Sequence, residues 1–241
     1  MREAFLIVEN IRKKLPTANY ICEKIKWIGV LLFLIAVIYG GHKLSTVVAS
    51  NVLGDQQIVV IDAGHGGDDP GKIGINNVLE KDINLEIAKE MKKILEDAGI
   101  TVVMTREEDD SLSNNKTEDL QKRVEIIDGS KAAIAVSIHQ NSYSSEAEKG
   151  AQVFYYSESE EGIKIAQTLQ NHLKMLDPEN RREIKENNTY FILKRTKTPT
   201  VIVECGFLSN WEEAEKLAGT EYQKQLAQVI SEGILTYMSQ E

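Results

Sequence analysis

The chain of 241 residues has a net charge of −9, and 42% of its residues are hydrophobic and 27% are charged. This length and composition fit one globular domain with an extension. Residues 1–49 contain seven of the 28 Lys and Arg residues and three of the 37 Asp and Glu residues, so the rest of the chain has a net charge of −13. A domain with this much negative charge repels polyphosphate backbones, which argues against nucleic acid as a partner. Cys205 is the only cysteine after residue 49, which excludes an internal disulfide there.

An uncharged apolar stretch follows a basic flank at the N-terminus. Residues 27–41, WIGVLLFLIAVIYGG, contain no charged residue, and residues 1–26 carry six Lys and Arg against three Glu. The stretch is shorter than the ~20 residues of a membrane span and suits the apolar core of a signal peptide. Because the basic flank stays in the cytoplasm, the C-terminal part is expected outside it. We expect residues 1–49 to be an export segment, cleaved before Ser50 or kept as an anchor, and to make the only membrane contact.

Residues 50–57 read as a linker, and the domain of residues 58–241 then alternates short apolar runs with amphipathic segments. Strands are expected at residues 58–61, 101–105, 132–138, 151–156 and 200–205, with 190–194 as a further short strand. Helices are expected at residues 83–98, 120–129, 163–176 and about 221–238. This alternation predicts an α/β fold, a single domain with a twisted, mainly parallel central sheet flanked by helices on both faces.

Polar residues gather where the apolar strands end. His65 follows the first strand in a glycine-rich loop, His139 follows the strand AAIAVSI, and Glu204 closes the strand TVIVEC. Glu80 comes where the next helix begins. In open parallel sheets the loops at the carboxyl ends of the strands carry the reactive groups. We therefore expect these four side chains to form one site.

The four residue types match the needs of a zinc hydrolase. Such an enzyme needs three nitrogen or oxygen ligands, one open position and a second carboxylate that moves protons. His65, Glu80 and His139 can supply the ligands, and Glu204 the second carboxylate. The glycines around His65 leave room for a metal and a substrate and permit a positive φ.

Each candidate ligand also has a simpler explanation when it is taken alone. His65 could cap a turn, and His139 could be a hydrogen-bonded histidine of the core. Glu80 could be an acid in the first turn of a helix, where the helix dipole stabilises it by ~0.3–1 kcal/mol. The string GHGG could also cradle a phosphate, but it lacks the GK[ST] ending of such loops.

Glu204 is harder to explain without a function. Its strand is otherwise apolar, and an unpaired buried carboxylate costs several kcal/mol. The carboxylate therefore needs either a task or a partner. A structural salt bridge to Arg106 or Arg123 is the alternative to a catalytic role.

Six stretches follow one another in residues 58–238: IDAGHGGDDPGKIG, LEKDINLEIA, RVEIID, VSIHQNS, GAQVFYY and PTVIVECGFLSNWEEAEKL. In this order they resemble the motifs of zinc-dependent N-acetylmuramoyl-L-alanine amidases of the amidase-3 type. The resemblance implies a zinc ion held by His65, Glu80 and His139, with Glu204 as the catalytic base. The family usually has alanine at the position of Gln140, and we expect Gln140 and Asn141 to contact the substrate.

The resemblance also implies the reaction and its setting. The substrate would be peptidoglycan, cleaved at the amide between the muramic acid lactyl group and L-alanine. The domain organisation, an export segment before a single catalytic domain, is most similar to that of the family members that act in sporulation and are specific to germination. Their product is the precursor of muramic lactam in the spore cortex, so the chain is expected to be secreted or anchored there. Whether an activator protein is also required, the sequence does not decide.

Two other functions share parts of this pattern. A non-catalytic, peptidoglycan-binding member of the fold would lack a ligand or the base, and none is missing here. A zinc carboxypeptidase acting on stem peptides would use the same metal chemistry. It would also need an arginine that grips the terminal carboxylate, and no loop arginine near these strand ends stands out.

Overall fold

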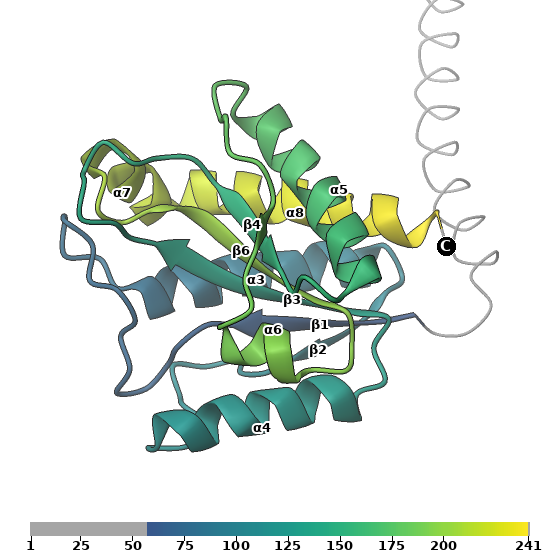
Figure 1. Ribbon diagram of the computed structural model, residues 1–241. Coiled ribbons are helices and arrows are strands. Elements are labelled where there is room, and N and C mark those ends of the chain that lie inside the picture. The colour runs from purple at the N-terminus through teal and green to yellow at the C-terminus, as the bar shows by residue number, and fades with distance from the viewer. Residues whose placement is uncertain (1–56, 241) are drawn as a thin grey trace, which may run out of the picture. The chain divides into compact units, whose positions relative to one another are not determined.

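Runs of β-branched and other apolar residues form one central sheet in the computed structural model, which describes residues 57–240 (Figure 1). The strand order is β2-β1-β3-β6-β4-β5. The first four strands in this order are parallel, β4 runs antiparallel to β6, and β5 is parallel to β4. The mainly parallel sheet predicted from the sequence is therefore confirmed. The strands are β1 (Ile58–Ala63), β2 (Thr101–Met104), β3 (Ile134–Asn141), β4 (Gln152–Tyr155), β5 (Lys185–Glu186) and β6 (Thr200–Phe207).

Helices cover both faces of this sheet, as the alternation of segments predicts. Three long helices, α3 (Glu80–Asp97), α5 (Glu160–Leu176) and α8 (Thr220–Met238), lie on one face (Figure 1). The other face carries α4 (Lys116–Gly129) and the short α6 (Phe191–Arg195). A further helix, α7 (Trp211–Ala218), follows β6 and packs against β6 and α8.

Successive residues of each central strand point into different cores. Ile61 of β1 and Val203 of β6 belong to the large core under α3, α5 and α8. Val60 of β1 belongs to a small core with Ile127 of α4 and Ile192 of α6. Burying one such side chain contributes about 1.5–3 kcal/mol, so the two-residue period fixes which way each strand faces. Because of the same period, every second residue along a strand points its side chain towards α4 and α6. These residues are Val60, the positions two apart from it on β1, and their partners on the neighbouring strands.

Several helices begin where a polar side chain caps the first turn. The Asn115 side chain accepts hydrogen bonds from the backbone N–H groups of Thr117 and Glu118 at 3.0 and 3.1 Å, so α4 begins at Lys116, earlier than its apolar pattern indicates. Ser159 caps α5 in the same way. Such caps are typically worth about 1 kcal/mol each.

The strand predicted at residues 190–194 is wrong, because Tyr190 caps the helix α6 and the next four residues belong to it. The Asn187 side chain accepts hydrogen bonds from the N–H groups of Thr189 and Tyr190, which turns the chain into a helix. A short apolar run fits a strand or a buried helical turn equally well, so its pattern could not distinguish them. The strand β5 and the helix α7 were not predicted at all.

Among residues 57–240, no helix is long and apolar enough to cross a membrane. The predicted export segment of residues 1–49 and the linker up to residue 56 lie outside the described residues. The domain boundary at residue 58 stays a prediction.

Two helical glycines differ in the space around them, and this gives opposite expectations for substitution by alanine. A Cβ on Gly233 of α8 would meet Leu169 Cδ2 of α5 at 2.7 Å, whereas a Cβ on Gly129 of α4 would meet nothing within 4 Å. Gly129→Ala should stabilise the fold by about 0.4–1 kcal/mol. Gly233→Ala should destabilise it by about 1 kcal/mol, because overpacking outweighs the gain in helix propensity. Urea unfolding of both variants measures the change in the free energy of unfolding. The same change in both variants would contradict the packing of α5 on α8.

Candidate metal centre

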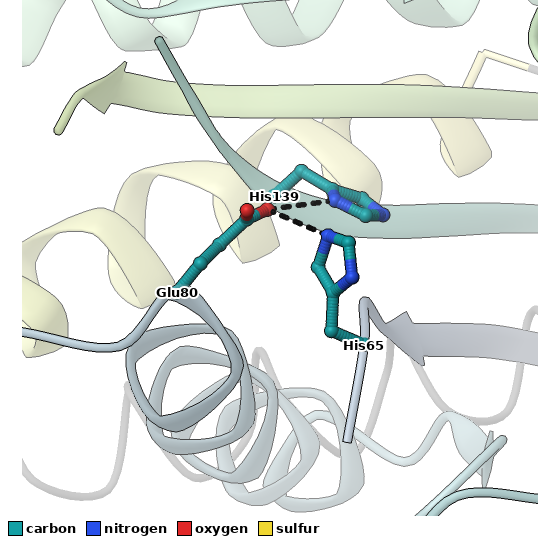
Figure 2. A group of neighbouring side chains, drawn as sticks. All are labelled: His65, Glu80 and His139. Atoms are coloured by element: carbon teal, nitrogen blue, oxygen red, sulfur yellow. Dashed lines mark hydrogen bonds and ion pairs between the residues drawn. The ribbon is translucent and has the colours of Figure 1, made fainter. Parts of the chain in front are cut away.

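Three side chains that can bind a metal ion meet at the carboxyl ends of β1 and β3. His65 follows β1, Glu80 is the first residue of α3, and His139 lies near the end of β3 (Figure 2). One nitrogen or oxygen atom of each lies within 4.8 Å of those of the other two. Glu80 Oε1 is 3.3 Å from His65 Nε2 and 2.9 Å from His139 Nδ1. The fold thus brings together the three residues that the sequence predicts as ligands.

Two glycines make this close approach possible. A Cβ on Gly64 would lie 2.3 Å from the ring of His139, where no atom fits. A Cβ on Gly71, which has a φ of +67°, would lie 2.6 Å from both Glu80 Oε2 and His65 Cδ2. His65 itself has a φ of 61°, an uncommon conformation for a residue other than glycine. The turn therefore holds His65 in a fixed, strained position facing Glu80.

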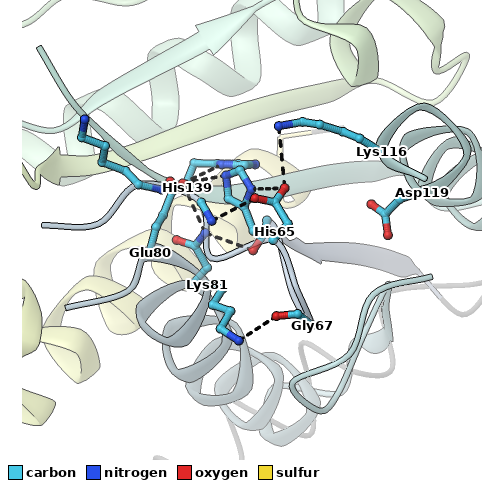
Figure 3. Close-up of polar contacts among 12 residues, drawn as sticks. His65, Gly67, Glu80, Lys81, Lys116, Asp119 and His139 are labelled. Atoms are coloured by element: carbon cyan, nitrogen blue, oxygen red, sulfur yellow. Dashed lines mark hydrogen bonds and ion pairs between the residues drawn. The ribbon is translucent and has the colours of Figure 1, made fainter. Parts of the chain in front are cut away.

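Hydrogen bonds fix the orientation of each candidate ligand. His65 Nδ1 lies 2.9 Å from Asp69 Oδ2, which leaves Nε2 directed at Glu80. Glu80 Oε2 accepts from the Lys72 backbone N–H at 2.7 Å. The loop is also tied down by Lys81, whose ammonium donates to the Gly67 carbonyl at 2.8 Å (Figure 3). Such partners of metal ligands determine which ring nitrogen is free to bind.

The electrostatics of the group favour a cation between the ligands. Burial opposes the ionisation of Glu80, but hydrogen bonds from His139 and His65 outweigh it and hold the pKa of Glu80 well below its usual range. Burial also opposes protonation of His139, and the Glu80 carboxylate outweighs this and raises the pKa of His139. Positive charge is therefore stabilised at the point where the three side chains meet.

Glu204 lies next to these residues but is not one of them. Glu204 pairs with His139 across β6 and β3, and its side chain is 7% exposed. Burial raises the pKa of Glu204 to about 7, and the charge of Glu80 adds to this while His139 opposes it. Among the described residues, no side chain or backbone group donates a hydrogen bond to Glu204 Oε2.

The alternative that Glu204 forms a structural salt bridge with an arginine is wrong. Arg123 lies 2.7 Å from both Asp62 Oδ1 and Asp119 Oδ2. Arg106 donates to backbone carbonyls, among them that of Gly64 at 3.0 Å. Both guanidinium groups are used to hold the loops around the site, and Glu204 is left with one unpaired oxygen.

A cleft of about 400 Å³ opens over the four residues. Phe191 and Ile192 of α6 and Tyr190, which precedes that helix, form part of its wall, and Lys116 of α4 also lines it. The predicted substrate contacts Gln140 and Asn141 lie at its edge, but the Gln140 side chain is buried. The site thus has a polar floor, formed by the candidate ligands and Glu204, beside a mainly apolar wall.

Residues 59–236 match the Amidase_3 family, described as N-acetylmuramoyl-L-alanine amidase. The match spans all of the sheet except its first residue, Ile58, and includes all four residues of the site. This chain belongs to that family.

Relatives of the amidase cover three quarters or more of its length. The germination-specific N-acetylmuramoyl-L-alanine amidase of Bacillus subtilis (strain 168) is 34% identical in an alignment 232 residues long, which covers 90% of this chain and 97% of that protein. The CwlD amidase from Clostridioides difficile, solved in complex with the GerS lipoprotein, is 37% identical, with a TM-score of 0.74 over 77% of this chain and 100% of that chain. The catalytic domain of CwlV, from Bacillus (Paenibacillus) polymyxa var. colistinus, is 32% identical, with a TM-score of 0.69 over 76% and 98%.

Several residues that support the site in the amidase were missed by the sequence analysis. Asp69 lies four residues after His65, and Asn84 lies four residues after Glu80, on the same face of α3. The spacing of Glu80 and Asn84 on a predicted helix was a usable signal. Tyr190 of the cleft wall gave no signal, because its segment was assigned to a strand.

A buried ion pair ties the His65 loop to α4. Asp62 of β1 is fully buried and Arg123 of α4 is 2% exposed, and Arg123 also donates to the His65 carbonyl at 2.7 Å. Burial opposes the ionisation of Asp62, but Arg123 and the hydroxyls of Ser137 and Thr105 outweigh it and lower its pKa to about 2. The end of β1 and the ligand loop are therefore anchored by one guanidinium.

Arg123→Met should destabilise the amidase domain by about 3–5 kcal/mol, because it leaves the Asp62 carboxylate buried without its partner. The double variant Asp62→Asn, Arg123→Met should recover part of this loss. Above pH 3.8, the free energy of unfolding of the wild type should exceed that of the double variant. This difference should shrink as the pH falls to about 2, since the folded state lowers the pKa of Asp62. Urea unfolding at several pH values measures both effects, with the exposed Arg181→Met as a control that changes stability by less than about 0.5 kcal/mol. A neutral Arg123→Met would contradict this account.

Proposed function

We propose that the chain is a zinc-dependent hydrolase of peptidoglycan that cleaves the amide between the lactyl group of muramic acid and L-alanine. One observation carries the proposal: the His65, Glu80 and His139 cluster adjoins Glu204, a buried carboxylate with an unpaired oxygen, on the floor of one cleft. Membership of the N-acetylmuramoyl-L-alanine amidase family gives the bond that is cleaved.

The donor set fits zinc. Two imidazole nitrogens and one carboxylate oxygen are ligands that catalytic zinc sites use, and three protein ligands leave one position open. With both histidines neutral, the set reduces the charge of Zn²⁺ to a net +1. Gly64 and Gly71 leave the space that the ion and its ligands require. A zinc ion held there would supply a Lewis acid that polarises the substrate carbonyl and makes water more acidic.

Glu204 would move the proton in the reaction. Its carboxylate takes a proton from the attacking water, whose oxygen forms a bond to the lactyl carbonyl carbon. When the C–N bond breaks, Glu204 returns the proton to the departing amine of L-alanine, so that a carboxylic acid and a free amine result, and the acid then ionises in water. A pKa near 7 lets one group both accept and donate a proton at neutral pH.

The cleft would position the substrate. The wall formed by Tyr190, Phe191 and Ile192 offers apolar surface, and the polar edge near Asn141 offers hydrogen-bonding groups. Such a combination of an apolar surface and a few polar groups is typical of ligand sites. In this proposal Asn141 contacts the substrate directly.

The relatives support a setting in sporulation. The Bacillus subtilis relative is a germination-specific amidase, and the CwlD structure contains the GerS lipoprotein. We propose by analogy that this chain acts on spore-cortex peptidoglycan, where its product is the precursor of muramic lactam, and that it works with a partner protein. The apolar stretch of residues 27–41 behind a basic flank supports export from the cytoplasm.

Glu204→Gln should keep zinc bound and reduce the release of stem peptides by at least ~10²–10⁴-fold, because the base is lost. His65→Ala should instead lose zinc. The measurements are mass spectrometry of muropeptides after digestion of purified peptidoglycan, with and without a chelator, and the zinc content of each variant. Glu212→Gln, on the surface of α7, serves as a control with normal activity.

The masses of the fragments decide between the functions. Free stem peptides with intact glycan support the amidase, stems shortened at the C-terminus would indicate a carboxypeptidase, and unchanged peptidoglycan would indicate a non-catalytic binding protein. Normal release by Glu204→Gln would remove Glu204 from its role as the base.

The test of export uses bacteria whose walls have been removed and whose cytoplasmic membranes are intact. Protease added to these cells should digest residues 58–241 of the full chain if the domain is exported. A Leu32→Arg, Ile35→Arg variant, which places two charges in the apolar stretch, should leave the domain protected in the cytoplasm. Immunoblotting against the C-terminus reads out both. Protection of the wild-type domain would contradict the export proposal.

A further inference from the structure

The side chain of Gln140 lies on the opposite face of the sheet from the cleft. His139 and Glu204 share the strand face that carries α4 and α6, whereas Gln140 follows His139 and contacts Asn84 of α3 on the other face. The register between β3 and β6 shifts at this point, so that Cys205 and Gly206 lie opposite Gln140 alone. Bulges of this kind occur beside active sites and redirect side chains.

A chain of hydrogen bonds leads from Gln140 to the candidate ligand Glu80. Gln140 Nε2 donates to Asn84 Oδ1 at 3.1 Å. Asn84 Nδ2 in turn donates to Glu80 Oε1 at 3.4 Å and to the Gly64 carbonyl at 3.2 Å. The Gln140 backbone N–H also donates to Glu80 Oε1, at 3.1 Å. Gln140 therefore contacts Glu80 twice, once directly through its backbone and once through Asn84.

The direction of these bonds is determined by the acceptors. The Glu80 carboxylate and the Gly64 carbonyl can only accept, so Asn84 must turn its NH₂ group towards them. Its oxygen then points at Gln140, which must present its own NH₂ group. Asn84 is fully buried and Gln140 is 4% exposed, so water does not compete for these groups. The negative charge of Glu80 thus orders two amides in sequence.

We propose that Gln140 and Asn84 are positioning residues that hold the Glu80 carboxylate in the geometry that binds the metal. This role replaces the substrate contact that the sequence indicates for Gln140. It rests on the proposed function, because it requires that Glu80 binds zinc. Partners of this kind fix the orientation of a ligand, and their loss typically weakens metal binding by ~10–100-fold.

The test is the zinc affinity of the full chain, measured by competition with a chromophoric chelator. Gln140→Met keeps the volume but not the amide, and it should weaken zinc binding by roughly 10–100-fold. Asn84→Ala should weaken it at least as much. The double variant should be no weaker than Asn84→Ala, because Gln140 acts largely through Asn84 and the two effects are not additive. At saturating zinc, the KM of Gln140→Met for peptidoglycan fragments should equal that of the wild type.

A matched control comes from α8. Gln223 is also a buried glutamine, and its side chain donates to the Leu217 carbonyl at 2.8 Å, away from the site. Gln223→Met should lower thermal stability without changing the zinc affinity. If Gln140→Met does not fold, Gln140→Ala provides the same comparison.

The outcomes separate this proposal from the proposed function. Unchanged zinc affinity with a raised KM in Gln140→Met would make Gln140 a substrate contact and overturn the positioning role. A wild type that binds no zinc would overturn both proposals. A wild type that binds zinc and releases no stem peptides would refute the amidase reaction, while a weakened zinc affinity in Gln140→Met would still support the positioning role.

Discussion

The carboxylate of Glu80 lies inside the protein between the imidazoles of His65 and His139, and this arrangement constrains the rest of the site. A buried carboxylate is costly unless donors surround it, and here the donors come from the two rings and from the backbone N–H groups of Lys72 and Gln140. The donors come from the loop after β1 and from the end of β3, whereas the carboxylate itself comes from the start of α3. The loop after β1, the start of α3 and the end of β3 must therefore be held close together before the site exists.

The parallel sheet brings these segments to one edge, and a few buried polar contacts set their final positions. Arg123 of α4 joins the end of β1 to the backbone of His65, and Asn84 of α3 joins Glu80 to Gly64. The apolar cores on both faces stabilise the fold, while these polar contacts set the positions of the site residues. The same division explains why the buried oxygen of Glu204 can stay without a donor: its strand is fixed by packing and by pairing with β3.

The grouping of the site residues was predictable from the sequence because it depends on local patterns. His65, His139 and Glu204 each follow or close a recognisable apolar strand, and the sheet type gives their common edge. The expectation of zinc and of the cleaved bond came from the resemblance to amidases. Contacts between distant segments, such as Asp62 with Arg123 or Gln140 with Asn84, leave no periodic signal, so the sequence offered both arginines as partners for Glu204. The helix α6 was missed because five residues are too few to show a period.

Cys205, which packs in the large core beside Gln140, determines how the described domain responds to oxidising or reducing surroundings. The thiol is 1% exposed, and burial raises its pKa, so almost none of it is present as the nucleophilic thiolate. Oxidants and disulfides reach a sulfur of this kind only when the fold opens. The folded domain therefore needs no reducing environment to stay intact, and it forms no mixed disulfides through this residue in an oxidising one.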